Sequence, residues 1–230
     1  MTRATLTISS KNYSSWSLRG WLLARFAGLE FVEQMLPPDD PGVRAEILLL
    51  APSILVPCLT HQGVRVWDTL AIAEYLAERH SGMWPADAKA RSWGRSITCE
   101  MHSGFGSMRN DMTMCIRERI DVRPWSPATT QNIQRVTQIW TESRSRFGTG
   151  GDFLCGAFSI ADCFYAPVAY RFQTYGVTPE NDAARTYLRH LLAHPLLQAW
   201  EKAALAETMV IEADEPRVVY RDKLAAAGRL

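Results

Sequence analysis

The amino-acid sequence predicts an α/β unit followed by an all-α unit. Residues 1–80 alternate runs of period two with runs of helical period, which is typical of an α/β unit. Beyond Pro85 the strand-like runs disappear and long helical periods replace them. With 230 residues, 47% of them hydrophobic and 21% charged, the chain is long and apolar enough for two small folded domains.

The first unit predicts the element order β-α-β-α-β-β-α. Residues 4–8 alternate and are β-branched, which predicts a strand. Apolar residues at helical spacing then predict a helix that begins at Ser14 or Ser15 and stops at Gly28. The remaining elements are a strand over 31–36, a loop rich in Pro and Asp over 37–42, a helix over 43–50, strands over 56–60 and 64–67 joined by a three-residue loop, and a helix over 69–79.

The second half predicts helices throughout. Ser159 and Asp162 have the Ser-x-x-acid spacing of a capping box, so we expect a buried helix over residues 160–172. The predicted division is 1–80 for the α/β domain, 81–88 for a linker, 89–212 for the helical domain and 213–230 for a flexible or surface-bound tail.

The net charge and the cysteine content of the chain indicate which classes of binding partner to expect. Twenty-five Lys and Arg against 24 Asp and Glu leave a net charge of +1, so no overall field favours nucleic acid or an anionic membrane. No apolar run approaches the about 20 residues of a membrane span. Five widely spaced cysteines favour reduced thiols in a cytoplasm over disulfides or a metal site. The expected partner is a small molecule, and no metal is expected.

Four short motifs occur along the chain, and their order is as informative as their residues. They are Ser14-Ser15-Trp16-Ser17-Leu18-Arg19, Val56-Pro57, Asp68-Thr69 and the capping box at Ser159. With the element order, they resemble the thioredoxin fold and, with the helical half, the cytosolic glutathione transferases over about residues 3–205. The first motif is similar to the Ser-Ser-Cys-Ser segment of the zeta class, the maleylacetoacetate isomerases, with Trp16 in place of the Cys. Ser14 thus takes the position of the family's catalytic serine.

The residue types in the first motif suit thiol chemistry. A tripeptide thiol reacts as its thiolate, whereas a free thiol with a pKa near ~8.5 is mostly protonated at neutral pH. A hydroxyl in the first turn of a helix can donate to the sulfur, and the N–H groups and dipole of that turn add positive potential. Ser14, Ser15 or Tyr13 can supply this hydroxyl.

The resemblance also implies how glutathione, the co-substrate, is bound. A cis bond at Val56-Pro57 would turn the Val56 backbone toward the cysteinyl backbone of the tripeptide, as a strand edge does. Asp68 and Thr69 would meet its γ-glutamyl end. A homodimer is implied by the resemblance as well.

The second substrate, a small electrophile, is expected between the two halves. Trp16 would form the floor of this site. Arg171 is similar in placement to the arginine that binds the substrate carboxylate in the zeta class. Further candidates recur at helical spacing and are Met101, His102, Phe105, Met108, Arg109 and Met112.

Two departures from the family pattern leave alternatives open. Ile54 and Leu55 are apolar where relatives offer a polar side chain to glutathione, and the 37–42 loop is acidic. These features favour a non-catalytic binding or scaffold protein with the same fold. A glutathione-dependent isomerase of the maleylacetoacetate type is the other alternative, which Arg171 favours and Trp16 disfavours.

Overall fold

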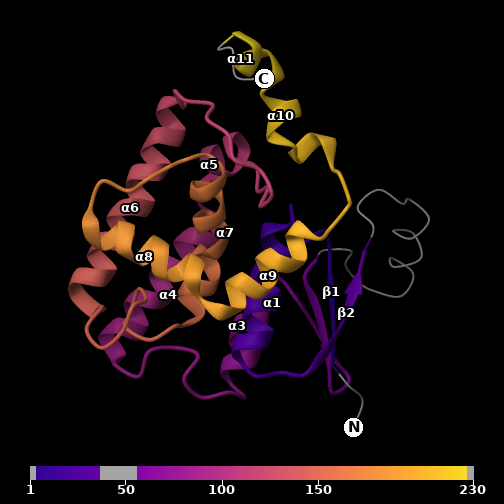
Figure 1. The fold of residues 1–230 in the computed structure, drawn as a ribbon. Coiled ribbons are helices and arrows are strands. Elements are labelled where there is room, and N and C mark those ends of the chain that lie inside the picture. Colours follow the sequence, from indigo (N-terminus) through magenta and orange to yellow (C-terminus); the bar gives the residue numbers. More distant parts are fainter. Residues whose placement is uncertain (1–3, 37–55, 227–230) are drawn as a thin grey trace.

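A computed structural model describes residues 4–36 and 56–226, and its two halves are the α/β and helical units that the sequence predicts (Figure 1). The predicted loop over 37–42, the helix over 43–50 and the Ile54-Leu55 pair lie outside the described residues. The sheet has the order β2-β1-β3-β4, with β1 parallel to β2 and antiparallel to β3, and β3 antiparallel to β4. The strands are β1 (Ala4–Ile8), β2 (Phe31–Met35), β3 (Cys58–His61) and β4 (Val64–Trp67).

The predicted end of the first helix is confirmed. Helix α1 (Ser15–Phe26) is followed by Gly28 at φ +69°, a conformation that glycine adopts without a Cβ clash. This turn lets the Leu29 N–H donate to the Ala24 carbonyl at 3.0 Å, which satisfies an end group of the helix. The chain then re-enters the sheet as β2.

The turn between β3 and β4 is shorter than predicted. His61 pairs with Val64, so only Gln62 and Gly63 lie between the strands. Both residues have positive φ, at 51° and 78°, as the two-residue turns that match strand twist require. The sequence pattern predicted the hairpin but made its loop one residue too long, because Gln, unlike Asn or Gly, is not a usual signal of a positive φ.

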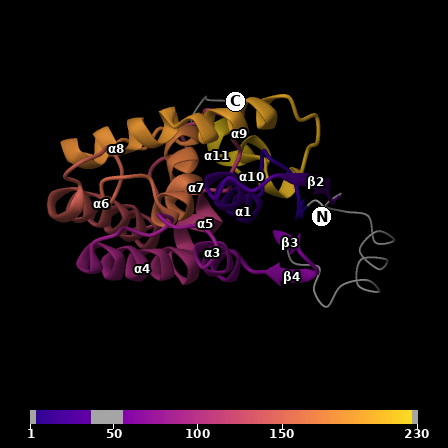
Figure 2. The same cartoon turned by 90° about the horizontal axis from the view of Figure 1, so that it is seen from below.

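Helix α7 (Ile160–Thr174) forms the centre of the helical half and packs against α1, α4 and α8 (Figures 1 and 2). Every residue in it except Gln173 is buried. The predicted capping box is confirmed, since Asp162 Oδ2 accepts the Ser159 N–H at 2.8 Å and the Ser159 hydroxyl at 2.9 Å. The other helices are α3 (Thr69–Ala77), α4 (Ala88–Ser103), α5 (Gly106–Asp111), α6 (Pro127–Phe147), α8 (Asp182–Ala193), α9 (Pro195–Leu205), α10 (Pro216–Val219) and α11 (Arg221–Ala226).

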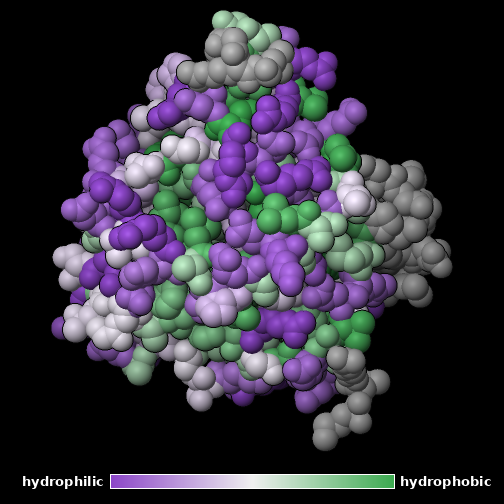
Figure 3. Space-filling model, viewed as in Figure 1, coloured by the Kyte–Doolittle hydropathy of each residue, from purple (hydrophilic) through white to green (hydrophobic). Residues whose placement is uncertain are grey.

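The segment after α9 contains short helices and is attached to the body of the protein. A 3-10 turn over Glu212–Asp214 leads into α10, and the Arg217 Nε lies 2.8 Å from the Glu118 Oε2. Figure 3 shows hydrophilic and apolar residues interspersed over one face of the molecule. No helix in the described part of the chain combines the length and apolarity that a bilayer crossing requires.

Candidate functional site

A pocket of about 270 Å³ lies beside the start of α1, and five residues of the predicted site come together in it. Its described lining consists of Trp16, Val56, Pro57, Asp68 and Thr69. These residues come from three separate motifs of the sequence, which the fold brings together at the first turns of α1 and α3. The Val56–Pro57 peptide bond is cis, as the resemblance implies.

Close packing of α1 on Pro57 sets one wall of the pocket. A Cβ atom built on Gly20 would lie 2.5 Å from Pro57 Cγ and 2.6 Å from Pro57 Cβ, well inside contact distance. Only glycine therefore allows α1 to approach the Val56–Pro57 segment this closely. The spacing from Ser14 to Gly20 places this contact in the second turn of the helix, just below the predicted thiol site.

Asp68 occupies an unusual backbone conformation at the pocket. Its φ of 70° and ψ of 134° lie in a sparsely populated region, which costs on the order of 1–3 kcal/mol for a residue other than glycine. Its carboxylate caps α3 by accepting the Leu70 N–H at 2.8 Å. The side chain is 47% exposed, so it remains accessible to a ligand. Backbone strain is thus held at a residue predicted to bind the tripeptide.

His102 joins the helical half to this pocket. Its Nε2 lies 3.3 Å from Asp68 Oδ2, and its Nδ1 lies 3.5 Å from Thr69 Oγ1. Its ring makes an edge contact with Trp16 at 5.3 Å between ring centroids. The helical stripe places His102 among the candidates, but nothing in its spacing sets it apart as the member that reaches the pocket.

Ser14 and Ser15 lie at the start of α1, next to Trp16. Ser14 is the N-cap: its Oγ accepts the Ser17 N–H at 3.2 Å and donates to the Ser17 Oγ at 2.9 Å. Within the described residues, the Ser15 Oγ forms no hydrogen bond, although the residue is only 7% exposed. Ser14 is half-buried, and its hydroxyl donates to Ser17.

Tyr13 turns away from the pocket, contrary to its predicted role in binding glutathione. Its hydroxyl bonds to the carboxylate of Glu215 and is contacted by the guanidinium of Arg117. Burial, followed by the bond to Glu215, raises the pKa of the Tyr13 hydroxyl well above its ordinary value. Tyr13 thus holds the C-terminal segment, and among the described residues it is not part of the pocket lining.

Most of the stripe predicted to line the electrophile site is core. Met101 and Met108 are 0% exposed and Phe105 is 8% exposed, and none of them is in the described pocket lining. The stripe assumed one continuous helix, but α4 ends before Gly104, and Phe105 adopts a left-handed conformation, with φ 63°, that starts α5. The break turns the apolar members of the stripe into the interior.

Arg19 and Arg109 pack against Trp16, and Arg171 is the third member of this arginine cluster. The guanidinium carbons of Arg19 and Arg109 lie 4.6 Å and 4.9 Å from the Trp16 ring centroid. Burial, and then the charges of Arg109 and Arg171, lower the pKa of Arg19 well below its ordinary value. The described residues supply no ion pair to any of the three, and Arg19 Nη1 and Nη2 are buried without a hydrogen-bond partner.

Among the described residues, the hydrogen bonds of this cluster are to backbone carbonyls. Arg19 Nε donates to the Phe164 carbonyl of α7 at 3.1 Å. Arg109 Nε donates to the Gly104 carbonyl at 3.0 Å, and Arg171 Nε to the Met112 carbonyl at 2.7 Å. Arg171 is 5% exposed, so in this structure it stabilises the core where the resemblance implied a substrate contact. Within the described residues, the cluster therefore places guanidinium groups without an ion-pair partner next to Trp16, a residue that lines the pocket.

Comparisons with known proteins agree with this architecture. The family model described as "Glutathione S-transferase, N-terminal domain" matches residues 13–79, and the one described as "Glutathione S-transferase, C-terminal domain" matches residues 126–203. Together the two matches cover more than half of the chain.

Solved structures show the same fold at low identity. A glutathione transferase homologue from Burkholderia with bound glutathione is 20% identical, with a TM-score of 0.65 over 90% of this chain and 100% of that one. A theta-class glutathione S-transferase from Xanthomonas axonopodis pv. citri with glutathione bound is 19% identical, with a TM-score of 0.64 over 89% and 100%. A maleylacetoacetate isomerase from Anaeromyxobacter dehalogenans with bound GSH is 21% identical, with a TM-score of 0.62 over 88% and 96%.

Proposed function

The chain belongs to the glutathione S-transferase family, and on that premise we propose that it binds glutathione in the 270 Å³ pocket and activates its thiol for attack on a small electrophile. The observation that carries this proposal is the composition of the pocket. Val56, Pro57, Asp68 and Thr69 were predicted from separate motifs to bind the tripeptide, and they share one cavity. Three of the similar structures were crystallised with glutathione bound, which supports the same ligand here.

The pocket residues offer binding partners for two parts of glutathione, the γ-glutamyl moiety and the cysteinyl backbone. The Asp68 carboxylate suits the ammonium group of the γ-glutamyl moiety, and the first turn of α3 at Thr69 offers N–H groups to its carboxylate. The Val56 backbone would pair with the cysteinyl backbone as an added strand does. This placement directs the cysteinyl sulfur toward the start of α1.

Stabilisation of the thiolate is assigned to the start of α1. When sulfur is present, the Ser14 hydroxyl would rotate from Ser17 and donate to it, while Ser15 stands next in line with an unbonded hydroxyl. The dipole of the first turn and the arginines that pack against Trp16 would add positive potential. Lowering a thiol pKa by about one unit takes ~1.4 kcal/mol, which one charge-assisted hydrogen bond can supply.

Two measurements test this function. Titration calorimetry with glutathione separates a ligand-binding enzyme from a scaffold protein that has lost the ligand. Ultraviolet difference spectra across pH then report whether the bound thiol ionises below its solution pKa. Absent binding, or a bound thiol with an unshifted pKa, contradicts the proposal.

The arginine cluster favours a second candidate, a glutathione-dependent isomerase of an acidic substrate. A buried guanidinium without a counter-ion is unfavourable unless an anion compensates it, and Arg19 is such a group. A substrate carboxylate near Trp16 would compensate it. Turnover of a carboxylated electrophile and of its uncharged ester, measured in the natural protein and in Arg109→Gln, separates the two candidates, since only the acid-specific enzyme prefers the carboxylate and loses that preference with the arginine that lies over Trp16.

A further inference from the structure

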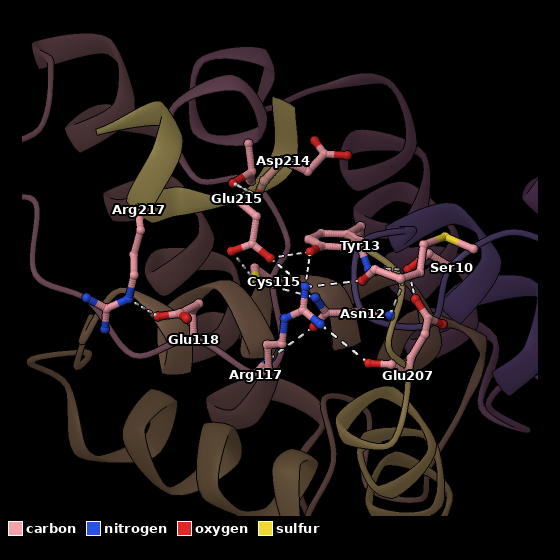
Figure 4. Close-up of polar contacts among 12 residues, drawn as sticks. Ser10, Asn12, Tyr13, Cys115, Arg117, Glu118, Glu207, Asp214, Glu215 and Arg217 are labelled. Carbon is pink, nitrogen blue, oxygen red and sulfur yellow. Dashed lines mark hydrogen bonds and ion pairs between the residues drawn. The ribbon is translucent and has the colours of Figure 1, made fainter. Parts of the chain in front are cut away.

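Residues 207–219, here called the C-terminal strap, contact the loop over residues 9–14, which joins β1 to α1 (Figure 4). The strap leaves the end of α9, includes the turn over Glu212–Asp214 and ends with α10. In Figure 1 this part of the chain starts beside α1 and runs up to α10. None of its residues is in the described lining of the pocket, so its relation to the site is indirect.

Glu207 binds the start of the loop. One carboxylate oxygen accepts the Ser10 hydroxyl, and the other accepts the Lys11 N–H at 2.7 Å. The Ser10 Oγ in turn accepts the Tyr13 N–H at 3.2 Å, and the Ser10 carbonyl accepts the Ser14 N–H at 3.0 Å. Glu207 is therefore connected to the first residues of α1 through a single serine.

Glu215 binds the end of the loop. Its carboxylate accepts the Tyr13 hydroxyl, and its Oε1 lies 2.6 Å from Nη2 of Arg117. The Arg117 backbone N–H donates to Asn12 Oδ1 at 3.1 Å, so the same arginine also holds the middle of the loop. Glu215 is only 9% exposed, and a carboxylate this buried is stable only with such partners.

This loop is held at both ends and therefore has few alternative conformations. Ser10 and Asn12 are 0% exposed, and Ser9 donates its N–H to Ser17 Oγ, the same oxygen that receives the Ser14 hydroxyl. Any shift of the loop therefore moves the hydrogen bonds of the thiol-facing turn. A displacement of about 1 Å at a reacting centre can lower a rate by about 100-fold.

We infer that the C-terminal strap is a positioning element for the thiolate site, in which Glu207 and Glu215 fix the loop that presents Ser14 and Ser15 to the sulfur. This inference rests on the proposed function. It extends the site to Glu207 and Glu215, which lie 197 and 202 positions from their partners in the loop, and to Arg117, 104 positions from Tyr13. These residues act through the loop and not on the substrate.

The test compares Glu215→Gln and Glu207→Gln with Arg217→Gln as a matched control. Arg217 lies in the same strap, but its ion pair is with Glu118 and not with the loop. In the two Glu variants, amide hydrogens of residues 10–17 should exchange about tenfold faster, because the loop opens more easily. The thiol of bound glutathione should ionise about threefold to tenfold less at neutral pH, a rise of up to about one pKa unit. The control should match the natural protein in both measurements.

Cooperative thermal unfolding of each variant shows that it is folded. Should Glu215→Gln fail to fold, Tyr13→Phe removes a single hydroxyl from the same contact and carries the test. Unchanged exchange over residues 10–17 in the folded variants overturns the inference, and so does faster exchange with an unaltered thiol pKa. If the natural protein itself leaves the bound thiol un-ionised, the proposed function fails, which is a different result from an ionised thiol that ignores the strap.

Discussion

His102 Nε2 lies 3.3 Å from Asp68 Oδ2, so a residue of the helical half contacts the carboxylate expected to bind the γ-glutamyl group. Both side chains are partly exposed, at 23% and 47%, so solvent screens the pair and the contact orients Asp68 more than it stabilises the fold. We therefore expect glutathione binding to depend on α4 as well as on the α/β domain.

Replacement of either partner should weaken glutathione binding to a different extent. Asp68→Asn removes the charge opposite the ligand ammonium and should raise the Kd for glutathione about tenfold, equivalent to ~1.4 kcal/mol. His102→Gln keeps a polar side chain and should raise it about threefold. Calorimetric titration measures both, and Asp87→Asn, which changes the cap of α4 instead, serves as a control. Equal affinities in all four proteins would remove Asp68 from the site.

Ser14→Ala should affect catalysis and stability together. Loss of the N-cap should lower the free energy of unfolding by about 1 kcal/mol. Loss of the hydroxyl should raise the pKa of the bound thiol by about one unit with little change in glutathione affinity. Ser14→Thr, which retains a hydroxyl, should keep most of both. Ser15→Ala should change the thiol pKa much less, and the opposite order would move the catalytic role to Ser15.

Gly20→Ala should push α1 away from Pro57. The added methyl group meets the proline ring at 2.5 Å, an overpacking that costs about 1–3 kcal/mol, while the gain in helix propensity returns only about 1 kcal/mol. We expect lower thermal stability and weaker glutathione binding. Gly106→Ala is the matched control, because a Cβ there has nothing within 4 Å. If Gly20→Ala binds glutathione normally, the wall at Pro57 is not critical to the ligand.

Asp162 should give the protein a pH-dependent stability. Burial raises the pKa of its carboxyl to about 6, despite hydrogen bonds from Leu154, Ser159 and Tyr187. The folded state therefore binds the proton more tightly than the unfolded state, whose carboxyl titrates near ~3.9. Between about pH 4 and pH 6 the free energy of unfolding should fall as pH rises, by up to about 3 kcal/mol.

Urea unfolding across this pH range measures the effect. The slope should flatten in Asp162→Asn and persist in Asp222→Asn, which changes an exposed residue. A natural protein whose stability rises through the same window, with no difference from Asp162→Asn, would show that the buried carboxyl stays ionised.

Local signals predicted most elements and motifs of the described residues, and long-range contacts account for the main errors. Gly28 ends α1 and Ser159 starts α7 through contacts within a few residues, which a sequence pattern records directly. Tyr13 lies in the loop directly before Ser14, but its partners Glu215 and Arg117 lie 202 and 104 positions away, so no local pattern predicts its orientation. The apolar stripe of the second half was correct in periodicity, yet periodicity does not register a break such as the left-handed Phe105.

Arg19 of α1 donates to the Phe164 carbonyl of α7, and its guanidinium carbon lies 5.5 Å from the centroid of the Phe164 ring, so α1 is matched to a side chain of α7 as well as to its backbone. Helix α1 belongs by sequence to the first half, but its buried side is shaped to fit one particular α7. A chimera joined between α3 and α4, with the helical half of another family member, would set this arginine against a foreign backbone. We therefore expect a chimera of two family members to fold stably only when α1 and α7 come from the same parent protein.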